Sequence, residues 1–504
     1  MPIEVELKLS ATPAAYAAVR RHRALADAKA GRARATAIVS RYYDTPADEL
    51  HQHGIALRLR RRGNRWIQTV KGAGEAAAGM HRRAEFEWPL SHPRLDAARL
   101  ATTPWADLFA DAAARLTPVF TTEVTRTEQA LEFDDGTRAT LSFDQGAVRA
   151  GRKRSPLCEI EIELVEGDVR RLYDLALALC ADIPLTLAHA SKADQGYALA
   201  RSRPARPVRA EKVALAADVS APRALATIAI DCLTQIGANA ESMRAGRDGE
   251  FLHQLRVGLR RMRSLLQLTA TVASEAEIAS LDERLVALGA VFGPARDWDV
   301  FTSAALPAIA PHLGDKERRG FARLRLRAAR QRRLHRAAAQ SEAGSPRFAC
   351  LLLALGRFCV GLDLAAGEPP AAALAREALE RGARRLRKRG KRLRGADAAA
   401  RHRVRVAAKK LRYVAEFFAP LFRHAGASDY VAALSEVQGA LGRLNDMAVA
   451  ARLLDQLITR VPGDADISHA VGIVHGWTAA AGARELERLP KSWRQFARAK
   501  PFWN

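Results

Sequence analysis

Residues 3–9 read Ile3-Glu4-Val5-Glu6-Leu7-Lys8-Leu9, so charged and apolar side chains alternate along the whole stretch. Residues two apart in a β-strand share a face, which predicts a strand with Glu4, Glu6 and Lys8 on one side. The first 200 residues repeat this period at 55–60, 66–71, 85–88 and 159–164. We therefore expect a sheet with one apolar and one charged face, and the turn signal Asp135-Gly136 separates two of its strands.

The charged face carries stripes of both signs. Arg58-x-Arg60, Glu85-x-Glu87 and Glu159-x-Glu161-x-Glu163 each place like charges on one side of a strand. A polar face exposed to water would explain any single stripe, but it gains nothing from gathering several carboxylates that repel one another. Carboxylate oxygens are preferred ligands of Mg²⁺ and Mn²⁺, and arginine pairs bind phosphate oxygens. Stripes that faced inward in a closed sheet would form a site for a metal and a phosphate.

The organisation changes near residue 200. Before it, helical stretches at 14–30 and 169–181 interrupt the strands; at 201–217, prolines such as Pro204 mark a linker. Beyond it nearly every segment has a helical period, with breaks that include Gly293-Pro294. We therefore expect an α+β chain with an N-terminal domain at 1–200, a linker at 201–217 and an all-α domain at 218–504.

An internal repeat lies within the helical part. The motif His253-x-x-Arg256-Val257-x-x-Arg260-Arg261-x-Arg263 recurs 149 residues later, with His402 in the place of His253. The same displacement maps Asp297 onto Asp446, which predicts two pseudo-symmetric halves. On a helix this spacing gathers cations on one face, which repel one another unless an anion compensates them; a solvated helix face is the alternative. The members of the two faces are His253, Arg256, Arg260, Arg263, His402, Arg405, Lys409 and Arg412.

Charge is distributed unevenly along the 504 residues. Residues 1–200 hold 28 Lys and Arg against 26 Asp and Glu. Residues 201–504 hold 52 Lys and Arg against 29 Asp and Glu, and therefore carry most of the net charge of +25. A field of that sign attracts polyanions, either nucleic acid, anionic membrane or polyphosphate. Five scattered cysteines without CxxC spacing indicate neither disulfides nor zinc. Without a leader or a membrane span, the sequence favours the cytoplasm.

The N-terminal 200 residues resemble the CYTH, or triphosphate tunnel metalloenzyme, family. The resemblance rests on an ordered set of motifs: Glu4-x-Glu6-x-Lys8, Tyr42-Tyr43-Asp44-Thr45, Leu57-Arg58-Leu59-Arg60, Thr69-Val70-Lys71, Arg83-x-Glu85, Arg126, Asp144-x-Gly146, Cys158 to Leu164 and Ser191-Lys192. It implies an antiparallel β-barrel tunnel with flanking helices, in which carboxylates hold Mg²⁺ or Mn²⁺ and basic residues hold a triphosphate.

The resemblance also implies a role for each position. The metal side comprises Glu4, Glu6, Glu85, Asp144, Glu159, Glu161 and Glu163. The triphosphate side comprises Lys8, Arg58, Arg60, Lys71, Arg126 and Lys192, and the catalytic residues are Glu4, Glu6 and Lys8. Family members act on inorganic triphosphate, thiamine triphosphate, RNA 5′-triphosphate or ATP, and the motifs do not separate these substrates.

Residues 218–500 resemble the CHAD domain, a histidine-containing helical domain that binds inorganic polyphosphate. The two His-centred motifs carry this resemblance, which implies two helical bundles around a basic groove and an association with polyphosphate granules. Nucleic acid is disfavoured because few aromatic residues accompany the basic helices. A phosphate-binding tail favours inorganic triphosphate as the tunnel's substrate. The leading prediction is thus an inorganic triphosphatase, and the alternatives are a non-catalytic polyphosphate-binding scaffold and a hydrolase of another triphosphate.

Overall fold

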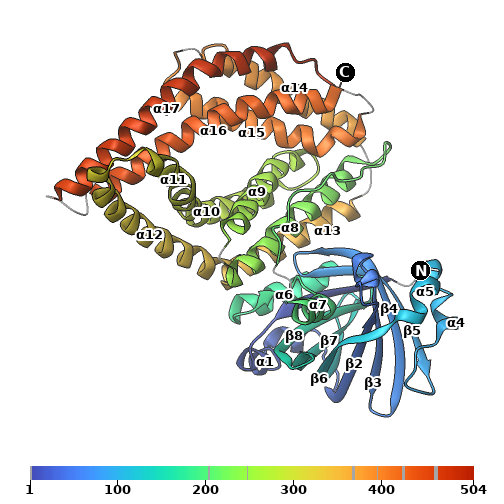
Figure 1. The fold of residues 1–504 in the computed structure, drawn as a ribbon. Helices are drawn as coiled ribbons and strands as arrows, with labels where there is room; N and C mark the ends of the chain where they lie inside the picture. Colours follow the sequence, from blue (N-terminus) through green and yellow to red (C-terminus); the bar gives the residue numbers. More distant parts are fainter. Residues whose placement is uncertain are drawn as a thin grey trace. The chain divides into compact units, whose positions relative to one another are not determined.

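A computed structural model describes residues 3–202, 205–246, 248–365, 369–393, 395–422, 426–458 and 464–503. Two compact units divide the chain. The first comprises residues 1–208, 233–245 and 343–361, and the second comprises residues 209–232, 246–342 and 362–504. The expected change from a mixed to an all-helical architecture is confirmed, because every described strand that belongs to the sheet lies before residue 190 (Figure 1).

A closed antiparallel sheet forms the centre of the first unit. Its strands run in the order β5-β4-β3-β2-β6-β7-β8-β1, and β1 pairs with β5 to close the barrel. The short strand β9 pairs with the last two residues of β1. The strands are β1 Ile3–Ser10, β2 Arg34–Asp44, β3 Ala56–Arg62, β4 Arg65–Ala77, β5 Met80–Leu90, β6 Thr117–Glu132, β7 Arg138–Ala150, β8 Lys153–Glu166 and β9 Thr186–Leu187. The barrel predicted from the resemblance is therefore confirmed.

Short helices accompany the barrel, and α7 packs on β6, β7 and β8. They are α1 Pro13–Val19, α2 Arg23–Asp27, α3 Glu49–Gln52, α4 Ala97–Leu100, α5 Ala106–Ala112, α6 Arg170–Asp182 and α7 Lys192–Arg201. The helical stretch predicted at 14–30 is divided into two helices: His22 accepts a hydrogen bond from the backbone N–H of Ala24 and so starts the second one. Between β6 and β7, Gly136 adopts the positive φ that the predicted turn requires.

Helices, most of them long, form most of the rest of the chain. They are α8 Ala221–Ala245, α9 Gly249–Leu266, α10 Glu275–Val300, α11 Leu306–Ile309, α12 Asp315–Ala343, α13 Pro346–Leu364, α14 Ala371–Gly390, α15 Ala398–Phe418, α16 Gly426–Ile458 and α17 Ala465–Arg498. The repeated motifs occupy α9 and α15, which pack on each other and on α10 and α16, respectively. In the second unit, Trp298, Phe301 and Val471 belong to a continuous buried core.

The break predicted at Gly293-Pro294 is wrong, because α10 continues through both residues. Arg256 of α9 donates hydrogen bonds to the carbonyls of Phe292 and Gly293, and Phe292 and Ala295 are fully buried on either side. Tertiary packing thus outweighs the local helix-breaking effect of proline.

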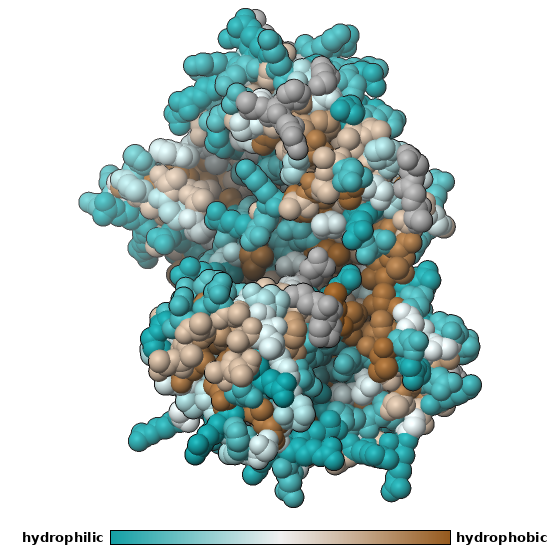
Figure 2. Space-filling view, turned by 90° about the vertical axis from the view of Figure 1, so that its right-hand side faces the viewer, coloured by the Kyte–Doolittle hydropathy of each residue, from teal (hydrophilic) through white to brown (hydrophobic). Residues whose placement is uncertain are grey.

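The face seen in Figure 2 is mostly hydrophilic, with hydrophobic residues gathered in several patches, one of them elongated. None of the helices in the described ranges is long and apolar enough to cross a membrane.

Candidate functional site

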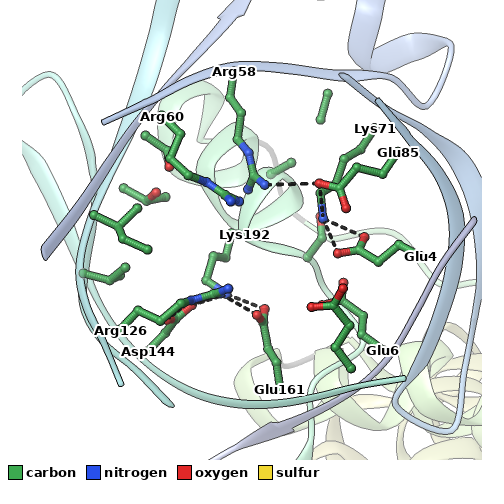
Figure 3. A pocket seen from close by; sticks show the side chains of 18 of the residues that line it. Glu4, Glu6, Arg58, Arg60, Lys71, Glu85, Arg126, Asp144, Glu161 and Lys192 are labelled. Atoms are coloured by element: carbon green, nitrogen blue, oxygen red, sulfur yellow. Dashed lines mark hydrogen bonds and ion pairs between the residues drawn. The ribbon is translucent and has the colours of Figure 1, made fainter. Parts of the chain in front are cut away.

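Charged side chains from the barrel strands converge on one cavity of about 190 Å³ (Figure 3). On β1, Glu4, Glu6 and Lys8 face this cavity, while Leu7 and Leu9 are completely buried on the opposite face. The period-two pattern thus predicted the orientation correctly. Among the predicted tunnel residues, those that line the cavity are Glu4, Glu6, Lys8, Arg58, Arg60, Lys71, Glu85, Arg126, Asp144, Glu161, Glu163 and Lys192.

Glu161 of β8 connects the basic residues on one side of the cavity. Its carboxylate accepts hydrogen bonds from Lys8 Nζ and Lys192 Nζ, both at 2.6 Å, and from Arg126 Nη2 at 2.5 Å. Burial alone would raise the pKa of Glu161, but Lys192, Lys8 and Arg126 hold it well below its usual range. The carboxylate is therefore ionised at neutral pH.

Lys192, the first residue of α7, connects three carboxylates in the same way as Glu161 connects three cations. Its Nζ lies 2.9 Å from Asp144, 2.7 Å from Glu159 and 2.6 Å from Glu161. Asp144 also receives two hydrogen bonds from Arg126, its cross-strand partner. Contrary to the prediction, Glu159 does not line the cavity. Besides its ion pair with Lys192, it accepts a hydrogen bond from Gln195.

On the other side, Glu4 and Glu6 form ion pairs with Lys71 and Arg83. Lys71 Nζ lies 2.6 Å from Glu4, and Arg83 donates to Glu4 at 3.2 Å and to Glu6 at 2.8 Å. Arg83 was not among the predicted site residues, although its position two residues before Glu85 places it on the same face of β5. Arg62 and Glu128 also line the cavity and were not predicted, and Glu87 lines it as the predicted Glu85-x-Glu87 stripe requires.

Arg58 and Arg60 of β3 present unused hydrogen-bond donors. Arg58 Nη1 lies 3.4 Å from the hydroxyl of Tyr42, and Arg58 Nη2 lies 3.5 Å from Glu85. Within the described part of the chain, however, Arg58 Nε and Nη2 and Arg60 Nε are buried without a hydrogen-bond partner. Since an unsatisfied buried donor costs about 1–3 kcal/mol, these atoms favour an anion in the cavity.

Glu163 of β8 lies opposite Glu6 of β1 and adds a third carboxylate to Glu4 and Glu6 in the lining of the cavity. Burial and the nearby carboxylates of Glu4 and Glu6 raise the pKa of Glu163 to about 7. Repelling oxygens of this kind suit a hard divalent cation. The described residues contain no group of three ligands already arranged around a metal position, and Lys71 and Arg83 pair with Glu4 and Glu6. The donor chemistry thus fits Mg²⁺ or Mn²⁺, provided that these ion pairs rearrange.

The motif Tyr42-Tyr43-Asp44-Thr45 has a partly structural role. Tyr42 lines the cavity, but Asp44 is completely buried outside it. Asp44 accepts hydrogen bonds from the backbone N–H groups of Leu50 and His51 and from the hydroxyl of Tyr197 at 2.6 Å. It therefore fixes α3 and α7 to the end of β2.

A second cavity, of about 1060 Å³, lies within the helical unit. The basic faces of α9 and α15 line it, and Arg260 Nε of the first half lies 3.4 Å from Tyr413 Oη of the second. Tyr413 and Ser264 occupy equivalent repeat positions, so the two halves of the lining differ. The lining basic residues are His253, Arg256, Arg260, Arg263, Arg296, His402, Arg405, Lys409, Lys410 and Arg443.

The cations of this second cavity destabilise one another. Burial, Arg260 and Arg405 lower the pKa of Lys409 to about 6, and burial and Arg260 lower that of Arg256 to about 10. Burial and neighbouring arginines, Arg296 first, lower the pKa of His253 to about 4. Arg405 Nε is buried with no hydrogen-bond partner among the described residues. Such a cluster stores unfavourable electrostatic energy that a bound polyanion would relieve.

Arg412 is one predicted member that does not line the cavity. Its guanidinium donates to Gln438 at 2.8 Å and also to Glu416, one helical turn further along α15. Arg263 lines the cavity but is paired with Asp282 at 2.8 Å. Asp297, which repeats as Asp446, is paired with Arg452.

Two protein-family models match the chain: the CYTH domain over residues 2–197 and the CHAD domain over residues 227–455. An inorganic triphosphatase from Haemophilus influenzae is 32% identical over 160 residues, which make up 31% of this chain and 44% of that protein. The chain thus spans less than half the length of this curated relative. The crystal structure of the CHAD domain from the plant Ricinus communis matches 58% of this chain and 98% of its own, with 34% identity and a TM-score of 0.52.

Proposed function

The chain contains a CYTH domain followed by a CHAD domain, and from this premise we propose that the barrel hydrolyses inorganic triphosphate. The observation that carries the proposal is the set of buried donors on Arg58 and Arg60 that lack a hydrogen-bond partner among the described residues and face carboxylates across the same small cavity. An anion rich in oxygens satisfies these donors, and the carboxylates opposite suit a divalent cation. The name of the Haemophilus relative supports the same activity.

Phosphoryl transfer depends mainly on positioning and charge neutralisation, which the tunnel residues supply. Arg58 and Arg60 bind the phosphate oxygens with their free donors, and Lys8 and Lys71 add positive charge along the cavity. Arg126 and Lys192, held by Asp144 and Glu161, complete the phosphate-binding set. Their carboxylate partners keep these two cations fixed before substrate binds, so little reorganisation is needed during the reaction.

We propose that Glu4, Glu6 and Glu163 form the centre of the metal site. When bound, Mg²⁺ or Mn²⁺ would neutralise phosphate oxygens and polarise the attacking water. Glu163 supplies the carboxylate whose pKa its acidic neighbours raise, and a cation would relieve that repulsion. The remaining predicted ligands are Glu85, Asp144, Glu159 and Glu161.

The lining favours an inorganic substrate over a nucleotide or a thiamine ester. Tyr42 is the one aromatic residue among the described residues that line the tunnel cavity, and it is already stacked on Phe120. An organic ring would therefore find little surface on which to stack. Thiamine triphosphate, RNA 5′-triphosphate and ATP remain the alternatives to test.

A separate observation supports polyphosphate binding by the helical unit. The larger cavity gathers cations from both repeats that lower one another's pKa, and a chain of phosphates could contact both basic helices at once. Nucleic acid offers similar phosphates, but the lining holds few aromatic side chains for bases. A cytoplasmic location with binding to polyphosphate granules follows as a prediction.

Replacing Glu4 and Glu6 together by glutamine tests whether the two activities are separate. In the double variant, the rate of metal-dependent triphosphate hydrolysis should fall by more than about 100-fold, because two carboxylates that neutralise the cation are lost. Polyphosphate affinity, measured by titration calorimetry, should stay within twofold of the wild-type value. Loss of both activities together would contradict two independent sites, and an inactive wild type that still binds polyphosphate would favour a non-catalytic scaffold.

A further inference from the structure

Lys192 enters the tunnel from a short segment that connects β9 to α7. The Ser191 side chain caps α7, and Asp194 completes a capping box, so the helix start is fixed locally. The position of Lys192 Nζ among Asp144, Glu159 and Glu161 therefore depends on how the preceding residues are held.

The barrel holds this segment from one side. Lys8 N donates to the carbonyl of Gly79, and Lys8 O accepts from Ala188 N at 3.2 Å. His81 Nε2 lies 3.1 Å from the carbonyl of Ala188. Burial and Lys8 lower the pKa of His81 to about 4, so its imidazole is neutral and can donate to that carbonyl.

Helix α8 holds the same segment from the other side, with residues that belong to the first compact unit. Gly237 packs directly on the imidazole of His189: a Cβ atom at this glycine would lie 2.0 Å from His189 Cε1 and 2.2 Å from Nε2. No side chain fits there unless the ring moves. One turn along α8, the carboxylate of Glu241 interacts with the backbone N–H groups of Ala190 and His189. Glu241, Gly237 and His189 line the same small cavity.

We propose that Gly237 and Glu241 of α8 are positioning residues for Lys192, which they hold in the tunnel through the backbone of His189 and Ala190. Both lie outside the residues matched by the CYTH model, so the catalytic unit extends into a helix that follows it in the sequence. The proposal rests on the proposed hydrolysis of triphosphate in the tunnel. It assigns part of helix α8 to the triphosphatase site rather than to polyphosphate binding alone.

The test uses Gly237→Ala in the full chain, with Gly361→Ala as the matched control. Gly361 lies in α13, also within the first compact unit, and a Cβ there meets nothing within 4 Å. A displacement of about 1 Å at a binding group can cost up to roughly 100-fold in rate. Gly237→Ala should therefore reduce kcat/KM for triphosphate at least about tenfold, mainly through KM, whereas Gly361→Ala should leave it unchanged.

A second substitution separates positioning from general damage. His189→Ala removes the ring that the new Cβ would meet, so Gly237→Ala combined with His189→Ala should recover most of the activity lost in Gly237→Ala. Glu241→Ala should weaken hydrolysis in the same direction as Gly237→Ala. Polyphosphate affinity should be unchanged in every variant, because none of these residues lines the larger cavity.

Hydrogen–deuterium exchange provides a readout that does not depend on activity. Backbone amides of residues 186–192 should exchange faster in Gly237→Ala than in the wild type or in Gly361→Ala. Unchanged exchange together with unchanged kcat/KM would overturn the positioning role. If the wild type hydrolysed no triphosphate, the proposed function would fail, and exchange alone would decide whether α8 holds this segment.

Discussion

Lys409 illustrates how a single residue can reveal a binding site. It lies in the larger cavity, where burial, Arg260 and Arg405 lower its pKa to about 6, while Asp446 acts in the opposite direction. A lysine that is mostly neutral at pH 7 adds little to stability, but a polyanion beside it would favour its protonated form. Spacing in the sequence predicted that Lys409 belongs to a basic face; it could not predict the burial, which depends on contacts between α9 and α15.

This shift predicts a pH dependence for polyphosphate binding. Binding favours protonated Lys409 and so takes up a proton above its free pKa of about 6. Affinity should therefore fall as pH rises, by up to about 50-fold between pH 6 and pH 8. Titration calorimetry at both pH values measures this change.

Two variants assign the effect to Lys409. Lys409→Arg keeps its charge throughout this range and should flatten the dependence. His402→Asn removes the neighbouring imidazole of the lining, and the dependence should persist in it. A dependence that survived in Lys409→Arg but vanished in His402→Asn would show that the histidine is responsible.

At the scale of elements, strands with alternating charge were predictable and others were not. Strands β1, β3, β5 and β8 carry charged residues at every second position over at least part of their length, so the period itself identified them. Strand β6, Thr117–Glu132, contains many threonines, and its pattern alone did not identify it. The continuation of α10 through Pro294 depends on Arg256 of another helix, and no local pattern carries that information.

Helix α15 allows a direct comparison between a cation in the cavity and one outside it. Arg405 lines the cavity, whereas Arg412 on the same helix is hydrogen-bonded to Gln438 and Glu416. Arg405→Ala should weaken polyphosphate binding about tenfold, the value of one charge-assisted contact, and Arg412→Ala should change it less than twofold.

Thermal unfolding of the same two variants adds an independent check. Arg405→Ala removes a cation whose pKa is lowered first by burial and then by Arg260, while Asp446 acts in the opposite direction, so its Tm should stay close to that of the wild type. A lower Tm for Arg405→Ala, with unchanged binding, would assign Arg405 to packing instead.

At the scale of the whole molecule, the compact units do not follow the order of the sequence. Residues 233–245 and 343–361 join the unit of the barrel although they lie in helices far along the chain. Hydrophobic periodicity identifies such helices but does not say what they pack against. The domain limits predicted at 1–200 and 218–504 mark the change from a mixed to an all-helical architecture. That each of these domains has a function of its own remains a prediction.

The most direct test of the central claim measures phosphate release by the full chain. Inorganic triphosphate, ATP, thiamine triphosphate and long-chain polyphosphate are each supplied with Mg²⁺, with Mn²⁺ and with EDTA. The account predicts rapid release from triphosphate, abolished by EDTA, and much slower release from the other three. No release from triphosphate with either metal, or equal release in EDTA, would contradict a metal-dependent triphosphatase in the barrel.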